Sequence, residues 1–211
     1  MSSSPWWPGG DPPEPRPLDA PSALFERRVV LLSGELTDEA AGHVVAQLMT
    51  LDATGDEAIV LQVNAWGGTL DAAFSVMDTI DSVGVPVQTA CVGRAEGPAV
   101  GVVAVGAHRR AGSHARFRLC QPQFATSGTA AELAEWSLHC RRRLDRFADR
   151  LAQATGRPSA AIIDDLDRGR FLSADEAMRY GLIDDVGVNR PDVGPHRRRL
   201  GFARPAEPPT E

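Results

Sequence analysis

Cys120 is the strongest candidate nucleophile in this sequence, because a thiol attacks carbonyl carbon atoms once a base has removed its proton. The nearest upstream histidine is His114, six residues earlier on a segment that we expect to be extended. At about 3.3 Å per residue the two side chains lie roughly 20 Å apart, far beyond hydrogen-bonding distance. The two residues therefore do not form a dyad through local spacing.

Other acid or base side chains fall on segments with no evident relation to Cys120. His43 and His139 lie where the periodicity is helical, and ordinary surface or core histidines explain them more simply. Glu96 precedes a segment of small residues, where a negative charge favours the start of a helix. A hydrolase based on Cys120 or Glu96 stays open as a hypothesis.

The composition narrows the class of protein. The 211 residues are 43% apolar with a net charge of −6, which fits one domain and argues against a nucleic-acid-binding surface. No secretory signal is evident at the N-terminus, and the longest apolar run, residues 98–107, is too short to span a bilayer, so we expect a cytoplasmic protein without a membrane partner. Three cysteines without CxxC spacing predict free thiols, and no metal or other cofactor is implied.

Strand-like and helix-like segments alternate between two tails. Residues 1–22, rich in proline and glycine, predict a disordered N-terminal arm, and residues 189–211 predict a disordered C-terminal tail. The alternation between the tails predicts an α/β fold with mostly parallel strands. The expected strands are 28–32, 59–63, 87–92 and 115–119, and the expected helices between them are 38–51, 70–80 and 98–105.

A long helix follows the last of these strands. Thr129-x-x-Glu132 is a capping-box signature, and Gly156 with Pro158 predicts where the helix ends. Its apolar residues recur every three or four positions and form one seam along the helix, composed of Leu133, Trp136, Cys140, Leu144, Phe147, Leu151 and Ala154. The pattern fits packing on the same domain and docking on a partner equally well.

Residues from about 25 to 186 resemble ClpP, the proteolytic subunit of the ATP-dependent Clp protease, segment by segment. LQVNAWGG is similar to the family's NSPGG loop, and CVGRAEGPAVGVVAVGA to the GQAASMGA segment of its nucleophile. LCQP is similar to IHQP, and DRGRFLSADEAMRYGLIDDV to DRDxFMSxxEAxxYGLID. The resemblance implies a ClpP/crotonase-like superhelix of strand-helix units over 23–188, with a protruding handle at about 121–156 that contains the long helix after Thr129. It also implies heptameric rings stacked through the handles, built from this chain or with ClpP paralogues, and a Clp ATPase as a possible partner.

The resemblance places the family's catalytic triad on residues without its chemistry. Its serine falls on Gly97, its histidine on Cys120 and its aspartate on Gly169. The two donors of its oxyanion hole fall on Gly68 and Pro98, and a proline has no N–H to donate. We therefore expect no catalytic residue in this chain.

The segment after Pro122 departs from the family as well. Gln123, Phe124 and Ala125 replace a glycine-rich turn that binds the substrate strand, and the two larger side chains would crowd a peptide there. The leading hypothesis is a proteolytically inactive, structural or regulatory subunit of a Clp ring. The alternatives are the hydrolase with relocated catalysis and, from the fold alone, a crotonase-like module that binds acyl-CoA.

Overall fold

The computed structural model describes residues 20–122, 124 and 126–187. Helix α1 (Ala20–Phe25) begins inside the predicted N-terminal arm, so the expected boundary after residue 22 falls within a helix. The predicted C-terminal tail lies outside the described residues. None of the helices in these ranges combines the length and the apolar character needed to cross a bilayer.

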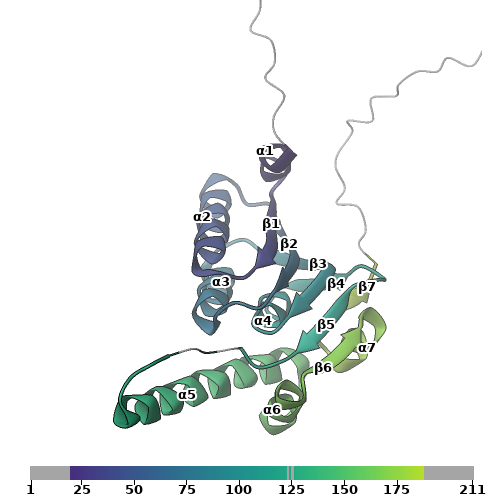
Figure 1. The fold of residues 1–211 in the computed structure, drawn as a ribbon. Helices are drawn as coiled ribbons and strands as arrows, with labels where there is room; N and C mark the ends of the chain where they lie inside the picture. Colours follow the sequence, from purple (N-terminus) through teal and green to yellow (C-terminus); the bar gives the residue numbers. More distant parts are fainter. Residues whose placement is uncertain (1–19, 123, 125, 188–211) are drawn as a thin grey trace, which may run out of the picture.

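The described strands form one mixed sheet (Figure 1). β1, β2, β3, β4 and β7 neighbour one another in that order, and β5 and β6 continue from β3. All pairs are parallel except β5 with β6, which confirms the predicted α/β fold with mostly parallel strands. The strands are β1 (Val29–Glu35), β2 (Ile59–Trp66), β3 (Val87–Glu96), β4 (His108–Ala111), β5 (Arg116–Leu119), β6 (Arg170–Ser173) and β7 (Asp185–Val186).

β3 changes its neighbour halfway along its length. Residues 88–91 pair with β4, whereas residues 94–96 pair with β5. Gly93 lies between these two parts with φ +104°, a conformation that side-chain-bearing residues rarely adopt. The predicted end of this strand at residue 92 was therefore too early, because the second half is held by a strand that is distant in sequence.

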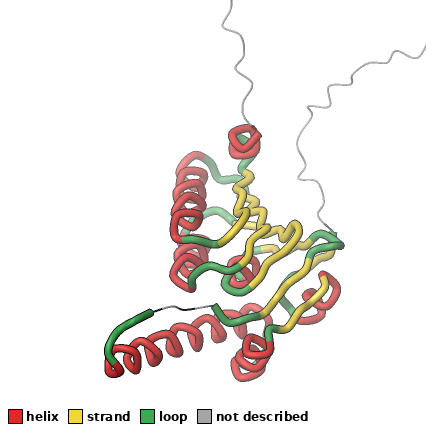
Figure 2. Tube along the Cα trace, in the orientation of Figure 1, coloured by secondary structure: helices red, strands yellow, loops and turns green. Residues whose placement is uncertain are grey.

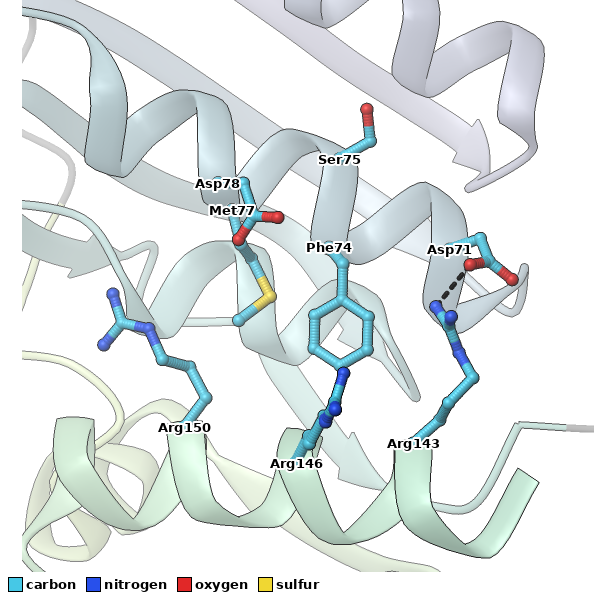
Figure 3. Close-up of a pocket in the computed structure, with 8 residues that line it drawn as sticks. All are labelled: Asp71, Phe74, Ser75, Met77, Asp78, Arg143, Arg146 and Arg150. Atoms are coloured by element: carbon cyan, nitrogen blue, oxygen red, sulfur yellow. Dashed lines mark ion pairs between the residues drawn. The ribbon is translucent and has the colours of Figure 1, made fainter. Parts of the chain in front are cut away.

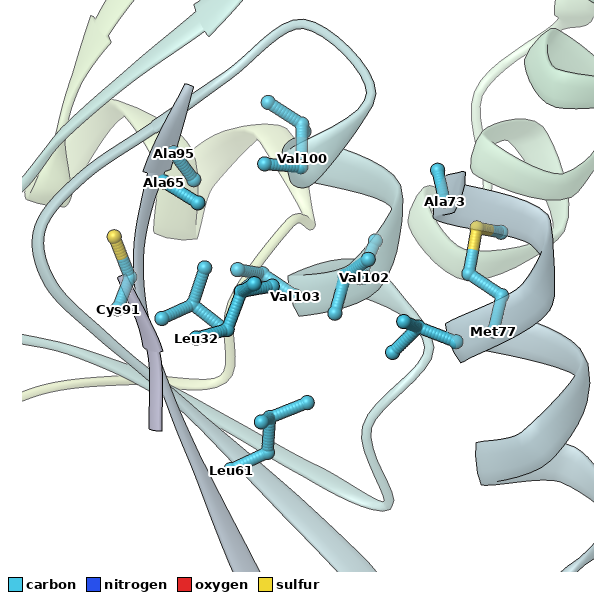
Figure 4. Packing of buried hydrophobic residues seen from close by; sticks show 14 of the residues in the cluster. Leu32, Leu61, Ala65, Ala73, Met77, Cys91, Ala95, Val100, Val102 and Val103 are labelled. Carbon is cyan, nitrogen blue, oxygen red and sulfur yellow. The ribbon is translucent and has the colours of Figure 1, made fainter. Parts of the chain in front are cut away.

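The first helices pack together beside the sheet. α2 (Asp38–Thr54) and α3 (Leu70–Ser82) lie side by side, and α4 (Ala99–Ala104) packs between α3 and the strands (Figures 1 and 2). Figure 4 shows the core between α3, α4 and the sheet around Leu61, Met77 and Val102, all essentially inaccessible to solvent. At Gly101 an added Cβ would lie 2.4 Å from the Phe147 ring, so α4 approaches its neighbours at van der Waals contact.

α5 (Ala130–Thr155) is the predicted long helix. The capping box between Thr129 and Glu132 forms, and Gly156 ends the helix in the left-handed conformation, as predicted. The apolar seam divides in two. Phe147 and Leu151 are fully buried, whereas Leu133 and Trp136 remain about two-fifths exposed on the part that extends away from the sheet (Figure 1). α6 (Ser159–Arg168) and α7 (Ala174–Tyr180) complete the fold near β6.

The base of α5 is attached to α3 by charged and aromatic contacts. Arg143 forms an ion pair with Asp71 (Figure 3), and Arg150 donates two hydrogen bonds of 2.8 Å to the Asp81 carboxylate. The Phe74 and Phe147 rings meet edge to face with centroids 6.3 Å apart. These contacts fix the direction in which the exposed end of α5 projects.

Candidate functional site

Three strands bring Gly97, Cys120 and Gly169 to one edge of the sheet. Glu96 pairs with Arg118 in parallel register, and the next N–H, that of Gly97, donates a 2.9 Å hydrogen bond to the Arg118 carbonyl. β5 and β6 run antiparallel with Leu119 opposite Arg170, so the next positions outward are Cys120 and Gly169. Residues that are far apart in sequence thus meet through strand pairing.

Gly97 occupies a buried turn between β3 and α4. A Cβ atom added to it would lie 3.6 Å from the Cys120 sulfur, which is ordinary contact. Its φ of +60° is left-handed, and a side chain there costs about 1–2 kcal/mol in backbone strain. The turn therefore has room for a side chain but favours glycine.

The Cys120 thiol is partly exposed at this edge. Burial raises its pKa above the ordinary value, the Arg118 charge opposes that rise, and the Glu96 charge adds to it. The thiol is consequently protonated near neutral pH. A nucleophilic cysteine needs the opposite change, a lowered pKa.

The described histidines have other neighbours. His108 pairs with Asp184 and Asp185, at 3.6 and 3.0 Å, where β4 meets β7. His139 stacks on Trp136 with ring centroids 5.6 Å apart, and His43 lies 3.9 Å from Glu39 on α2. His114 is exposed in the turn that precedes β5. The structure therefore places each of them in a setting other than that of a base for Cys120.

Glu96 is engaged by two arginines. Its mostly buried carboxylate lies 3.1 Å from the Arg116 guanidinium and 3.6 Å from that of Arg94. It is the last residue of β3, not the first turn of a helix. The prediction of a helix N-terminal charge was therefore wrong, since β3 runs further than expected.

Gly169 ends α6 in the left-handed conformation, with φ +65°. A Cβ there would lie 3.5 Å from a terminal nitrogen of Arg118, so an arginine stands beside the position on which the resemblance to ClpP places the aspartate. Sequence reasoning missed Arg118. The available signal was its position two residues before Cys120, since alternate residues of a strand share one face.

Pro98 is buried and has helical dihedral angles, φ −56° and ψ −29°. The helix itself begins at Ala99, one residue later than predicted, and the Pro98 carbonyl accepts a 3.0 Å hydrogen bond from the Gly101 N–H.

In the segment after Pro122, Phe124 is exposed, while Gln123 and Ala125 lie outside the described residues.

Gly67 and Gly68 form the turn between β2 and α3, both with positive φ. At Gly68 an added Cβ would lie 1.8 Å from the Leu36 carbonyl oxygen, a distance that no side chain tolerates. At Gly67 the nearest atom would be 3.8 Å away. Backbone packing alone therefore accounts for Gly68.

We expect Gly68→Ala to destabilise the protein clearly more than Gly67→Ala. Gly67→Ala costs only the strain of a left-handed backbone, about 1–2 kcal/mol. Gly68→Ala carries the same strain and must also displace the chain at Leu36. Urea unfolding at one protein concentration measures the free energy of unfolding of both variants. Equal losses of this free energy would show that the chain at Leu36 can move away from position 68.

An open pocket of about 380 Å³ lies over Cys120 and Gly169, whereas Gly97 is buried and does not line it. The lining of this pocket includes one thiol, two guanidinium groups and one carboxylate. None of the described lining residues carries a hydroxyl group that could act as a nucleophile. These residues are Arg118, Cys120, Gln121, Leu166, Asp167, Arg168 and Gly169.

A mostly parallel α/β sheet, a projecting α5 and a pocket between the C-terminal ends of β5 and α6 define a ClpP-like protein. The chain matches the family model described as Clp protease over residues 13–190. It therefore belongs to the Clp protease family, whose lineage is that of serine peptidases.

Proposed function

We propose that this protein is a non-catalytic subunit of a Clp protease ring, with a structural or regulatory role in the cytoplasm. The observation that carries the proposal is the composition of the site where Gly97, Cys120 and Gly169 meet. A serine peptidase needs a nucleophile, a base and an orienting acid in mutual contact. Gly97 and Gly169 have no side chain, and no histidine lines the pocket beside the Cys120 thiol among the described residues.

The chemistry of Cys120 argues against relocated catalysis. Its pKa is raised chiefly by burial, and the neighbouring acid Glu96 is held by Arg94 and Arg116. An activated thiol needs a lowered pKa or an adjacent base.

The projecting end of α5 supports assembly into rings. Leu133 and Trp136 are exposed large apolar side chains on one face of a helix whose base is anchored on α3. An apolar surface of this kind gains stability when a second copy or a paralogue covers it. Entry into rings, with a Clp ATPase docking on the assembly, is what family membership implies.

The proposal predicts no peptidase activity. The purified protein should neither cleave a fluorogenic peptide nor form an adduct with a fluorophosphonate probe, measured by intact mass, while an active family member treated in parallel does both. A stoichiometric adduct on this chain would refute the proposal.

A further inference from the structure

Arg118 is the charged side chain of the pocket that has no acidic partner and no side-chain hydrogen bond in the part of the chain that the structure describes. Its Nε is shielded from solvent and has no hydrogen-bond partner among the described residues. The ion pairs found within the described ranges do not include it, although Arg116 on the same face pairs with Glu96 at 3.1 Å. A shielded guanidinium nitrogen without an acceptor costs free energy, and the terminal nitrogens of the same guanidinium lie beside the open position of Gly169, where an acceptor can reach them.

The surroundings hold this guanidinium at the pocket wall. The Phe171 ring lies beneath it at 4.9 Å, and the absent side chain of Gly169 leaves space beside its terminal nitrogens. The charge acts on the pocket, since it lowers the pKa of the Cys120 thiol against the effect of burial.

The other charges of the lining are already engaged. Gln121 donates a hydrogen bond to Asp167, and Arg168 lies 2.9 Å from Asp164. One guanidinium therefore remains available, and a planar guanidinium matches a carboxylate in shape. The Asp167 charge in the lining opposes a doubly charged phosphate more strongly than a singly charged carboxylate.

We propose that this pocket binds a carboxylate of a peptide, either its C-terminus or an acidic side chain, through Arg118. The inference deepens the proposed function and rests on it, because a peptide held there must not be cleaved. A non-catalytic subunit would then retain a peptide at the former active site.

Alkylation of Cys120 reports this pocket directly. The Cys120 sulfur forms a bond to the methylene carbon of iodoacetate or iodoacetamide, iodide leaves, and the thiol proton passes to solvent. Peptide mapping separates Cys120 from Cys91, whose pKa burial raises to about 12, and from buried Cys140. The ratio of the two rates isolates carboxylate recognition, because any change in thiol pKa affects both reagents alike.

Arg118→Gln should lower the iodoacetate-to-iodoacetamide ratio about fivefold, since a partly exposed charge pair is worth roughly that factor. Arg118→Lys should restore most of the ratio. Arg146→Gln, at an exposed arginine of α5 that lines a different cavity, should leave the ratio unchanged. An unchanged ratio in Arg118→Gln would overturn the proposal.

Peptides distinguish the two sources of carboxylate. Protection of Cys120 from iodoacetamide by a neutral peptide with a free C-terminus, but not by its amide, identifies the C-terminal carboxylate. Protection by an amidated peptide with one glutamate identifies the side chain. Protection by neither at millimolar concentration would overturn the inference, whereas cleavage of a bound peptide would contradict only the proposed function.

Discussion

Leu133→Glu together with Trp136→Glu is expected to convert assembled rings into single subunits. Both side chains lie on the projecting part of α5 and are about two-fifths exposed in the isolated chain. A carboxylate forced into an apolar contact without a partner costs several kcal/mol, and a ring repeats that cost in every subunit. Native mass spectrometry of the protein purified from its own host measures the change directly.

The matched control changes the opposite face of the same helix. Ala131→Glu with Leu138→Glu adds the same charge at exposed positions, and it should leave the assembly intact. Leu151 is unsuitable for this test because it is fully buried in its own domain, so a glutamate there would damage the fold itself. If the first pair left the native mass unaltered, assembly would not involve this surface.

Adding Pro98→Ala to the triple change Gly97→Ser, Cys120→His and Gly169→Asp is expected to raise the rate of peptide cleavage about 100- to 1,000-fold. The triad and the oxyanion hole contribute separately, and one lost donor costs this factor, or roughly 3 to 4 kcal/mol. Pro98 is buried with helical dihedral angles, so alanine supplies the N–H without overfilling the site.

The quadruple variant should still be slower than an active family member. A serine at position 97 must adopt φ near +60°. The Arg118 guanidinium stands within reach of a new aspartate at position 169, so Arg118 competes with the new histidine for the carboxylate of that aspartate. A fluorogenic peptide assay on equally assembled samples compares the two variants. Equal, family-like rates in both would mean that Pro98 lies away from the oxyanion site, and no cleavage in either would point to a blocked peptide groove.

Helix α5 shows what local sequence determines. Its start depends on hydrogen bonds between Thr129 and Glu132, and its end on the left-handed Gly156, so both were predictable from residues in direct succession. The alternation of strand and helix likewise sufficed for a mostly parallel α/β fold. The motifs around Gly97, Cys120 and Gly169 indicated the family, which the match over residues 13–190 shows.

Other features depend on contacts between distant segments. Periodicity placed seven seam residues on one face of α5, but only the position of α3 and α4 decided that Phe147 is buried and Trp136 exposed. β3 extends to Glu96 because β5 pairs with it there. Arg118 reaches the pocket because β6 places Gly169, which has no side chain, beside it. A linear pattern specifies which face a residue occupies, whereas the neighbour it meets is decided by strand pairing and packing across the whole chain.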